Sequence, residues 1–191
     1  MSSDGSLQRC SWVGDKPEMI AYHDAEWGVP VHDDRILFEF LTLEAAQAGL
    51  SWLTVLRKRQ GYRAAFANFE AAQVACFDEH QVAALMNNAA IIRNRAKISA
   101  AISNAQRFLE VQAEYGSFAR YLWGFMAGEP RVNRPHSMAD IVATSPESDA
   151  LAKDLKRRGF KFLGSTVMYA HMQATGMVND HLVSCFRQAA V

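Results

Sequence analysis

Apolar residues recur at helical spacing along most of this chain, and that periodicity limits its fold more than any other feature. The pattern predicts helices around 36–43, 82–86, 98–109, 118–126 and 151–155, and a buried helix over 162–175. Ser148 is the expected N-cap of the 151–155 helix. Turn sequences separate these segments at 28–30, 128–130, 134–135 and 145–146. No stretch alternates apolar and polar residues as a strand does, so we predict an all-α fold.

The chain length sets the expected domain organisation. Its 191 residues suit one domain with a real core, and no linker or repeat divides them. We predict a disordered tail over 1–8, a single all-α domain over 9–187 that can form two lobes, and a second tail over 188–191. The N-terminus lacks the apolar core of a signal peptide, and no window approaches the roughly 20 apolar residues of a membrane helix. We therefore expect a cytoplasmic protein with no membrane partner.

The zero net charge hides two unlike parts. Residues 1–50 hold nine acidic and three basic residues, a net charge of −6, and residues 51–191 carry +6. The basic residues gather in two clusters, one at Arg57, Lys58, Arg59 and Arg63 and one over 153–161. Such clusters either contact phosphates or are solvated helix faces. The neutral total thus argues against binding nucleic acid by bulk charge but leaves a local basic face possible.

Cysteine and histidine stand together near both chain ends. Cys10 and His23 lie near the start, and His181 and Cys185 are four residues apart near the end. Two cysteines and two histidines suit a tetrahedral structural zinc ion, which would tie the ends together. The alternative is that these are ordinary buried or surface residues. With only three cysteines the chain is not a disulfide scaffold, and we expect the third, Cys76, to be a small packing residue.

A short loop over 87–94 joins two helical segments and is followed by basic side chains. A helix that starts after such a loop points backbone N–H groups and a positive dipole outward, which suits a phosphate. Arg93, Arg95 and Lys97 would add positive charge there. The alternative is an αα-hairpin that only packs.

Aromatic residues and one carboxylate mark the acidic part of the chain. Glu44 lies amid apolar residues, before a Gly-Leu-Ser break and Trp52. A buried carboxylate near Trp and Tyr rings would favour a flat cationic ligand. The alternative is an exposed Glu44 and aromatic side chains that belong to the core.

Seven ordered motifs make the chain resemble the DNA-3-methyladenine glycosylase I family. They are RCSWV at 9–13, AYHDAEWGVP at 21–30, LEAAQAGLSW at 43–52, IIRNRAKI at 91–98, YLWGF at 121–125, KRRGFKFLG at 156–164 and MQATGMVNDH at 172–181. The resemblance covers nearly the whole chain. It implies an all-α helix-hairpin-helix glycosylase that flips 3-methyladenine, a cationic alkylated purine, out of double-stranded DNA and hydrolyses it from the sugar.

The resemblance also implies roles for individual residues. Cys10, His23, His181 and Cys185 would bind one structural zinc ion. Glu44 would be the catalytic residue, and the base would contact Tyr22 and Trp52, with Trp12 and Trp27 nearby. Gly49 and Leu50 would meet the DNA, and we expect further DNA contacts from Gln47, Arg93, Arg95 and Lys97. We expect the protein to be a monomer. We also expect it to lack lyase activity, because no lysine is placed to form a Schiff base.

Two departures from the family pattern keep other interpretations open. Ala90 stands where the family's hairpin has a glycine, and would be strained if its φ were positive. Met19 stands where some relatives have an aromatic residue, and we could assign no catalytic aspartate. A non-catalytic module that binds damaged DNA is therefore the first alternative. A zinc-stabilised interaction protein with no nucleic-acid role is the second.

Overall fold

The structure, a computed structural model, describes residues 7–191, so the predicted N-terminal tail lies almost entirely outside the described residues. Its longer elements are the helices α1 (Pro17–Ala25), α2 (Asp34–Gln47), α3 (Trp52–Ala65), α4 (Ala71–Val74), α5 (Glu79–Met86), α6 (Arg95–Tyr115), α7 (Phe118–Gly124), α8 (Pro146–Arg157) and α9 (Ser165–Ala174). The strands are β1 (Arg131–Val132) and β2 (Val178–Asn179), and 3₁₀ turns occur at Ser11–Val13, Ala67–Phe69 and Met138–Asp140. The predicted all-α fold class is confirmed.

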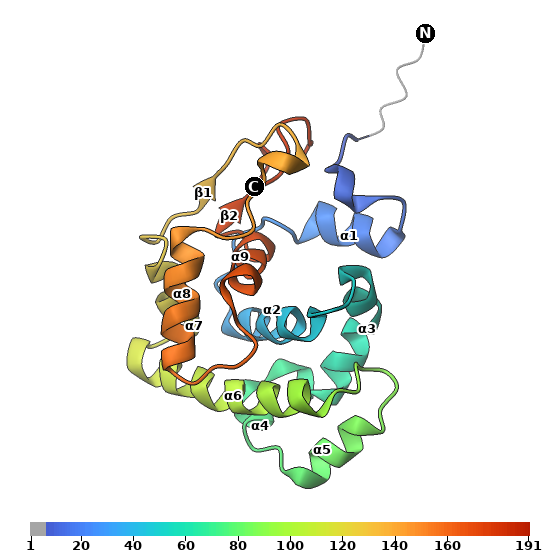
Figure 1. Cartoon of the computed structure of the whole chain (residues 1–191), viewed down its shortest axis with the longest axis vertical. Helices are drawn as coiled ribbons and strands as arrows, with labels where there is room; N and C mark the ends of the chain where they lie inside the picture. The colour runs from blue at the N-terminus through green and yellow to red at the C-terminus, as the bar shows by residue number, and fades with distance from the viewer. Residues whose placement is uncertain (1–6) are drawn as a thin grey trace.

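Helix α2 occupies the centre of the molecule (Figure 1), in contact with α3, α6, α7 and α9. Its residues from Leu37 to Ala46 are all buried, as expected for a helix that is apolar on most of its faces. Helix α6 runs along one side of α2, and its Ile98, Ile102 and Phe108 face the core as the predicted stripe requires. Helices α8 and α9 pack on each other beside α2.

Capping side chains fix where these helices begin. The Asp33 carboxylate accepts a hydrogen bond from the Ile36 N–H at the start of α2. Ser145, not Ser148, is the N-cap of α8, so that prediction was wrong. Ser148 is instead the third residue of a capping box, and its Oγ lies 2.9 Å from Ser165 Oγ of α9.

One short parallel pair of strands, β1 with β2, is present in the described residues. The prediction of no strand was therefore wrong, because two residues are too few to produce an alternating pattern. The pairing begins with the Arg131 N–H donating to the Met177 carbonyl at 2.9 Å. It fixes residues 131–133 beside residues 177–179.

A second apolar cluster lies where the two ends of the described chain meet. Its buried members are Cys10, Val13, Tyr22, Trp27, Phe40, Ala174, Leu182 and Cys185. The Phe186 N–H donates to the Gln8 carbonyl at 2.9 Å, and Asn179 Nδ2 donates to the carbonyls of Gln188 and Val191. Across residues 7–191 no helix combines the length and apolar character needed to span a membrane.

Candidate functional site

Four buried side chains from the two chain ends converge on one point. The ligand atoms of Cys10, His23, His181 and Cys185 all lie within 4.8 Å of one another. Cys185 Sγ is 3.4 Å from His23 Nε2 and 3.5 Å from His181 Nδ1, and Cys10 Sγ is 3.7 Å from His181 Nδ1. Sulfur and nitrogen ligands of a tetrahedral zinc ion lie about 3.5 Å apart. The donor set and its spacing therefore fit such an ion.

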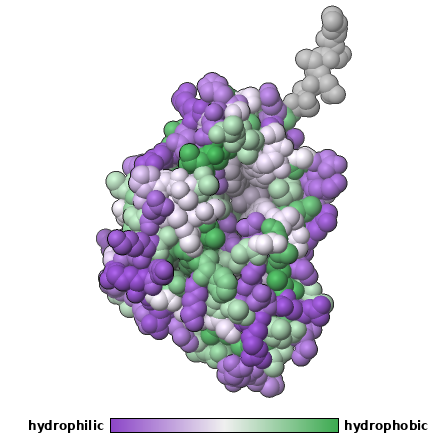
Figure 2. Space-filling view, in the orientation of Figure 1, coloured by the Kyte–Doolittle hydropathy of each residue, from purple (hydrophilic) through white to green (hydrophobic). Residues whose placement is uncertain are grey.

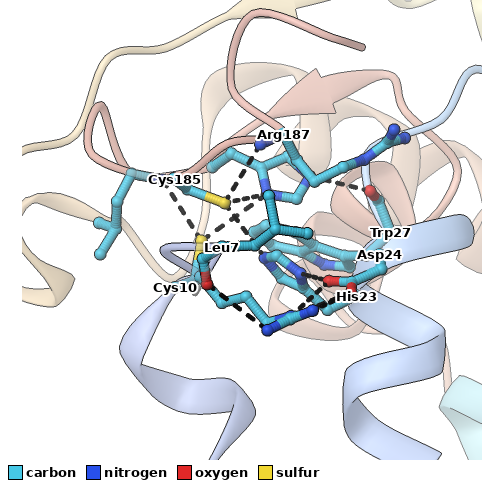
Figure 3. Close-up of polar contacts among 10 residues, drawn as sticks. Leu7, Cys10, His23, Asp24, Trp27, Cys185 and Arg187 are labelled. Atoms are coloured by element: carbon cyan, nitrogen blue, oxygen red, sulfur yellow. Dashed lines mark hydrogen bonds and ion pairs between the residues drawn. The ribbon is translucent and has the colours of Figure 1, made fainter. Parts of the chain in front are cut away.

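The groups around this cluster orient each ligand (Figure 3). His23 Nδ1 lies 2.8 Å from the Asp24 carboxylate, and His181 Nε2 lies 3.0 Å from the Trp27 carbonyl. These partners leave His23 Nε2 and His181 Nδ1 to face the sulfur atoms. Burial lowers the pKa of both histidines, to about 4 for His181, which favours the neutral, metal-binding form.

Beside this cluster lies a cavity of about 280 Å³. Its lining residues are Trp12, Met19, Tyr22, Trp27, Glu44, Gln47, Trp52, Met138, Ile141, Ala170 and Gln173. Figure 2 shows a hollow on the viewed face, in the region where Figure 1 places α1, α3 and α9. The structure therefore brings together all five side chains that the sequence analysis assigned to base recognition.

Aromatic rings form the walls of the cavity and continue to the cluster of Cys10, His23, His181 and Cys185. The Tyr22 and Trp52 ring centroids are 5.4 Å apart, and those of Trp12 and Trp27 are 5.0 Å apart in an edge-to-face arrangement. Trp12 also packs edge-on against His23, with 5.3 Å between centroids. Trp12 thus packs against one residue of the cluster and also lines the cavity.

Glu44 provides the cavity's carboxyl group. Its side chain comes from the last turns of α2, is 4 % exposed, and has its pKa raised by burial to about 8. Burial is the cause of this shift, and within residues 7–191 neither a nearby positive charge nor a hydrogen bond stabilises the ionised form. Burial, and to a smaller extent the charge of Glu44, also raises the pKa of Tyr22. A cationic ligand would supply the partner that Glu44 lacks.

The turn between α2 and α3 carries an exposed apolar side chain beside the cavity. Gly49 adopts a φ of +80°, which glycine accepts without strain, and the Leu50 N–H donates to the Gln47 carbonyl at 2.7 Å. Gln47 Nε2 donates back to the Leu50 carbonyl at 2.9 Å, and Ser51 caps α3. Leu50 stands at the tip of this fixed turn and is 39 % exposed.

The loop between α5 and α6 lies near that turn. Lys97 Nζ donates to the carbonyls of Ala46 and Ala48, at 2.8 and 2.6 Å, so its ammonium group holds the C-terminal end of α2. Arg95 pairs with Glu79 at 2.8 Å and is exposed, as is Arg93. The structure thus gives Lys97 an internal partner while both arginines lie on the surface.

Ala90 does not have the positive φ that would strain it. Its N–H donates to Asn88 Oδ1 at 2.9 Å, and Lys58 Nζ donates to the neighbouring Ala89 carbonyl. The loop packs so closely on α3 that a Cβ atom at Gly61 would come within 2.4 Å of the Ala90 carbonyl oxygen. The loop is therefore fixed by α3 as well as by its own turn.

Two expectations about single side chains were wrong. Arg59 is not available to phosphates, because it is 8 % exposed and pairs with the buried Glu39 and with Glu26. Cys76 is exposed rather than a packing residue. The local sequence around Arg59 could not predict its burial, because its partner Glu39 lies twenty residues away and on another helix.

Four lining residues of the cavity were not predicted from the sequence. Met138 and Ile141 come from the segment after β1, and Ala170 and Gln173 come from α9. None of them belongs to a residue class that predicts catalysis by itself. Gln173 does fall inside a motif quoted above, the MQATGMVNDH segment, and that was the available signal.

Comparison with known proteins places the chain among close relatives. The family model described as methyladenine glycosylase matches residues 12–188. The chain is 48 % identical to DNA-3-methyladenine glycosylase 1 of Escherichia coli, over 94 % of this chain and 96 % of that one. It is 43 % identical to DNA-3-methyladenine glycosylase of Haemophilus influenzae, with 93 and 96 % covered. The solved structure of 3-methyladenine DNA glycosylase I from Staphylococcus aureus matches with a TM-score of 0.92 and 35 % identity, with 96 and 98 % covered.

Proposed function

This chain belongs to the methyladenine glycosylase family, and we propose on that premise that it is a DNA repair enzyme that excises 3-methyladenine from alkylated DNA. The reaction is hydrolysis of the N-glycosidic bond. The observation that best supports this site is that Glu44 is buried in a cavity lined by Tyr22 and Trp52. Within residues 7–191 its carboxyl group has no hydrogen-bond or charged partner.

Recognition follows from the charge of the damaged base. A base inside a duplex cannot reach a cavity of this kind, so it must be flipped out at a cost of a few kcal/mol. Adenine methylated at N3 is positively charged while it is joined to the sugar. The rings of Tyr22 and Trp52 attract such a flat cation, and its charge favours the ionised form of Glu44. An undamaged, neutral purine gains neither interaction.

The positive charge also makes the base a good leaving group. Bond cleavage gives a transition state with oxocarbenium character at the sugar, which water then attacks. Glu44 stabilises the cationic base in the cavity until it departs. Among the lining residues that the structure describes there is no lysine, and the nearby Lys97 is held by two carbonyls. These facts favour simple hydrolysis without a strand-cleaving step.

The DNA would lie across the turn between α2 and α3 and the loop between α5 and α6. We propose that Leu50, at the Gly49 turn, fills the gap left by the flipped base, with Gln47 beside it. The exposed Arg93 and Arg95 would contact phosphates near the start of α6. Lys97 would act indirectly, by joining that start to the end of α2.

We also propose that the Cys10, His23, His181 and Cys185 cluster holds one structural zinc ion. All four ligand positions are filled by protein atoms, which leaves none for a substrate. When bound, the ion would stabilise the joined chain ends and through them the wall formed by Trp12 and Trp27. Since one chain supplies every residue of the cavity, we propose a monomeric enzyme.

Release of the free base from methylated duplex DNA tests this function directly. The purified protein should liberate 3-methyladenine and leave an abasic site, with an intact strand until alkali is added. Chromatography of the released bases gives the readout. A folded, metal-loaded sample that binds the DNA but releases no base would instead favour a damaged-DNA-binding module. Binding without any salt dependence would favour an interaction protein.

A further inference from the structure

Gln173 is a lining residue of the cavity whose side-chain amide donates a hydrogen bond to a buried carboxylate. It stands in the last turn of α9, and its backbone carbonyl accepts from the Gly28 N–H at 3.0 Å. Gln173 lines the same cavity as Glu44, Tyr22 and Trp52. A polar group whose orientation is fixed by a neighbour can select a ligand, because it cannot rotate to suit a wrong one.

A buried carboxylate determines which edge of the Gln173 amide faces the cavity. Gln173 Nε2 donates to Asp180 Oδ2 at 2.8 Å, and Asp180 is 2 % exposed. The carboxylate also accepts from Tyr169 Oη at 2.8 Å and Asn133 Nδ2 at 2.7 Å. Because a carboxylate only accepts, the amide nitrogen must be the end that faces Asp180. The amide oxygen is then directed away from Asp180.

The Gln173 oxygen is free to accept a hydrogen bond from a ligand. Within residues 7–191 the side-chain amide bonds through its nitrogen alone. Its oxygen is also absent from the buried polar atoms that lack a partner, so it is not sealed from solvent. The residues that line the cavity therefore include two oxygen-bearing groups of different kinds at Glu44 and Gln173, a carboxyl group and an amide.

The Glu44 carboxyl group and the Gln173 amide oxygen differ in the hydrogen bonds that they can make with a ligand. Burial raises the pKa of Glu44 to about 8, so near neutral pH its carboxyl group can donate or accept as the ligand requires. The Gln173 oxygen can only accept, and Asp180 prevents the amide from turning round. At position 6, an adenine carries an amine with two N–H groups, whereas a guanine carries a carbonyl oxygen.

We propose that Gln173 Oε1 accepts a hydrogen bond from the exocyclic amine of the flipped base and thereby selects 3-methyladenine over 3-methylguanine, with Asp180 as its positioning residue. This inference rests on the proposed function. A carbonyl oxygen at position 6 would face an acceptor that cannot reorient, and an unpaired polar group of this kind is a strong basis for rejection.

Methylated DNA contains both bases, so a single sample tests the selection. The measured quantity is the ratio of kcat/KM for release of 3-methyladenine to that for 3-methylguanine. In Gln173→Met, which keeps the side-chain length and removes the amide, we expect that ratio to fall about tenfold. The loss should be confined to 3-methyladenine. Gln173→Asn, which shortens the amide, should give the same direction of change and guards against a folding defect in the first variant.

Tyr169→Phe is the matched control. It removes a donor from the same Asp180 oxygen, but Tyr169 lines a neighbouring cavity instead of this one. Its ratio should remain that of the wild type. Equal losses for the two bases in both Gln173 variants, or an unchanged ratio, would overturn the inference while leaving the glycosylase assignment standing. If the wild type released neither base, the proposed function itself would fail.

Discussion

Burial of Glu44 should affect the stability of the fold as well as the proposed recognition of the base. The pKa of its carboxyl group is about 8 in the folded protein and near 4.5 when exposed. A group with a raised folded-state pKa favours folding while it is protonated. The resulting stabilisation is complete below about pH 4.5 and is lost as the pH rises through about 8.

Glu44→Gln should therefore change the pH dependence of stability. Glutamine cannot ionise, so the melting temperature of the variant should rise relative to wild type between pH 5 and pH 8. Release of 3-methyladenine should slow about 10- to 100-fold, because a hydrogen bond to a charged group contributes roughly 1.5–3 kcal/mol. Calorimetric scans across the pH range and the release assay measure the two effects. A melting-temperature difference that is constant with pH, or undiminished release, would contradict the role given to Glu44.

Single residues also mark where sequence reasoning was sufficient and where it failed. Glu44 could be recognised because a carboxylate amid apolar neighbours is unusual in itself. Gln173 could not, because its importance depends on Asp180, which reaches it only after the chain has turned through β2. Arg59 was misjudged for the same reason, since its partner Glu39 comes from another helix.

Among the elements, α3 and the loop over 87–94 pack so closely that there is no room for a side chain at Gly61. Gly61 lies inside α3, and a methyl group there would meet the Ala90 carbonyl oxygen at 2.4 Å, a backbone atom that cannot move aside alone. We expect Gly61→Ala to destabilise the fold by about 1–3 kcal/mol, the usual cost of overpacking. Urea denaturation measures this free energy of unfolding.

Gly124 provides a matched control for that substitution. It lies at the end of α7, and a Cβ atom there would have nothing within 4 Å. Gly124→Ala should therefore leave stability unchanged or raise it by up to about 1 kcal/mol. If both variants behaved alike, the contact between α3 and the loop would not be tight.

Periodicity predicted α2 and α5 to α9, where apolar residues recur at helical spacing, but it did not predict helices at α1, α3 or α4. The stripe over 98–109 lies inside α6, and the one over 151–155 inside α8. The boundaries were less certain, as the N-cap of α8 illustrates: Ser145 and Ser148 are both capping residues, and only the backbone shows which stands outside the helix. The paired strands were missed because each contains only two residues.

At the scale of the whole molecule, the cluster of Cys10, His23, His181 and Cys185 joins the two ends. We expect about one zinc ion per chain by elemental analysis. The double variant Cys10→Ser, Cys185→Ser should lose the metal and melt several degrees lower, because buried ligand groups would then lack a partner. Chelation of the wild type should lower the melting temperature in the same direction.

Cys76→Ser is the control for that experiment, since Cys76 is an exposed free cysteine outside the cluster. It should keep both the metal content and the melting temperature of the wild type. A metal-free wild-type protein of unchanged stability would contradict the proposed role of the cluster.

Seen as a polymer, a chain joined at Cys10 and Cys185 is a ring that encloses nearly all of its own residues. A metal link differs from a covalent one, because the unfolded chain does not hold the assembled site and the loop between the two ends closes only as the chain folds. The entropy cost of closing that loop grows with the logarithm of its length. The free energy of metal binding would offset that cost only in the folded protein, and would therefore add to its stability. The supply of metal would accordingly set how readily this protein refolds after it has been unfolded.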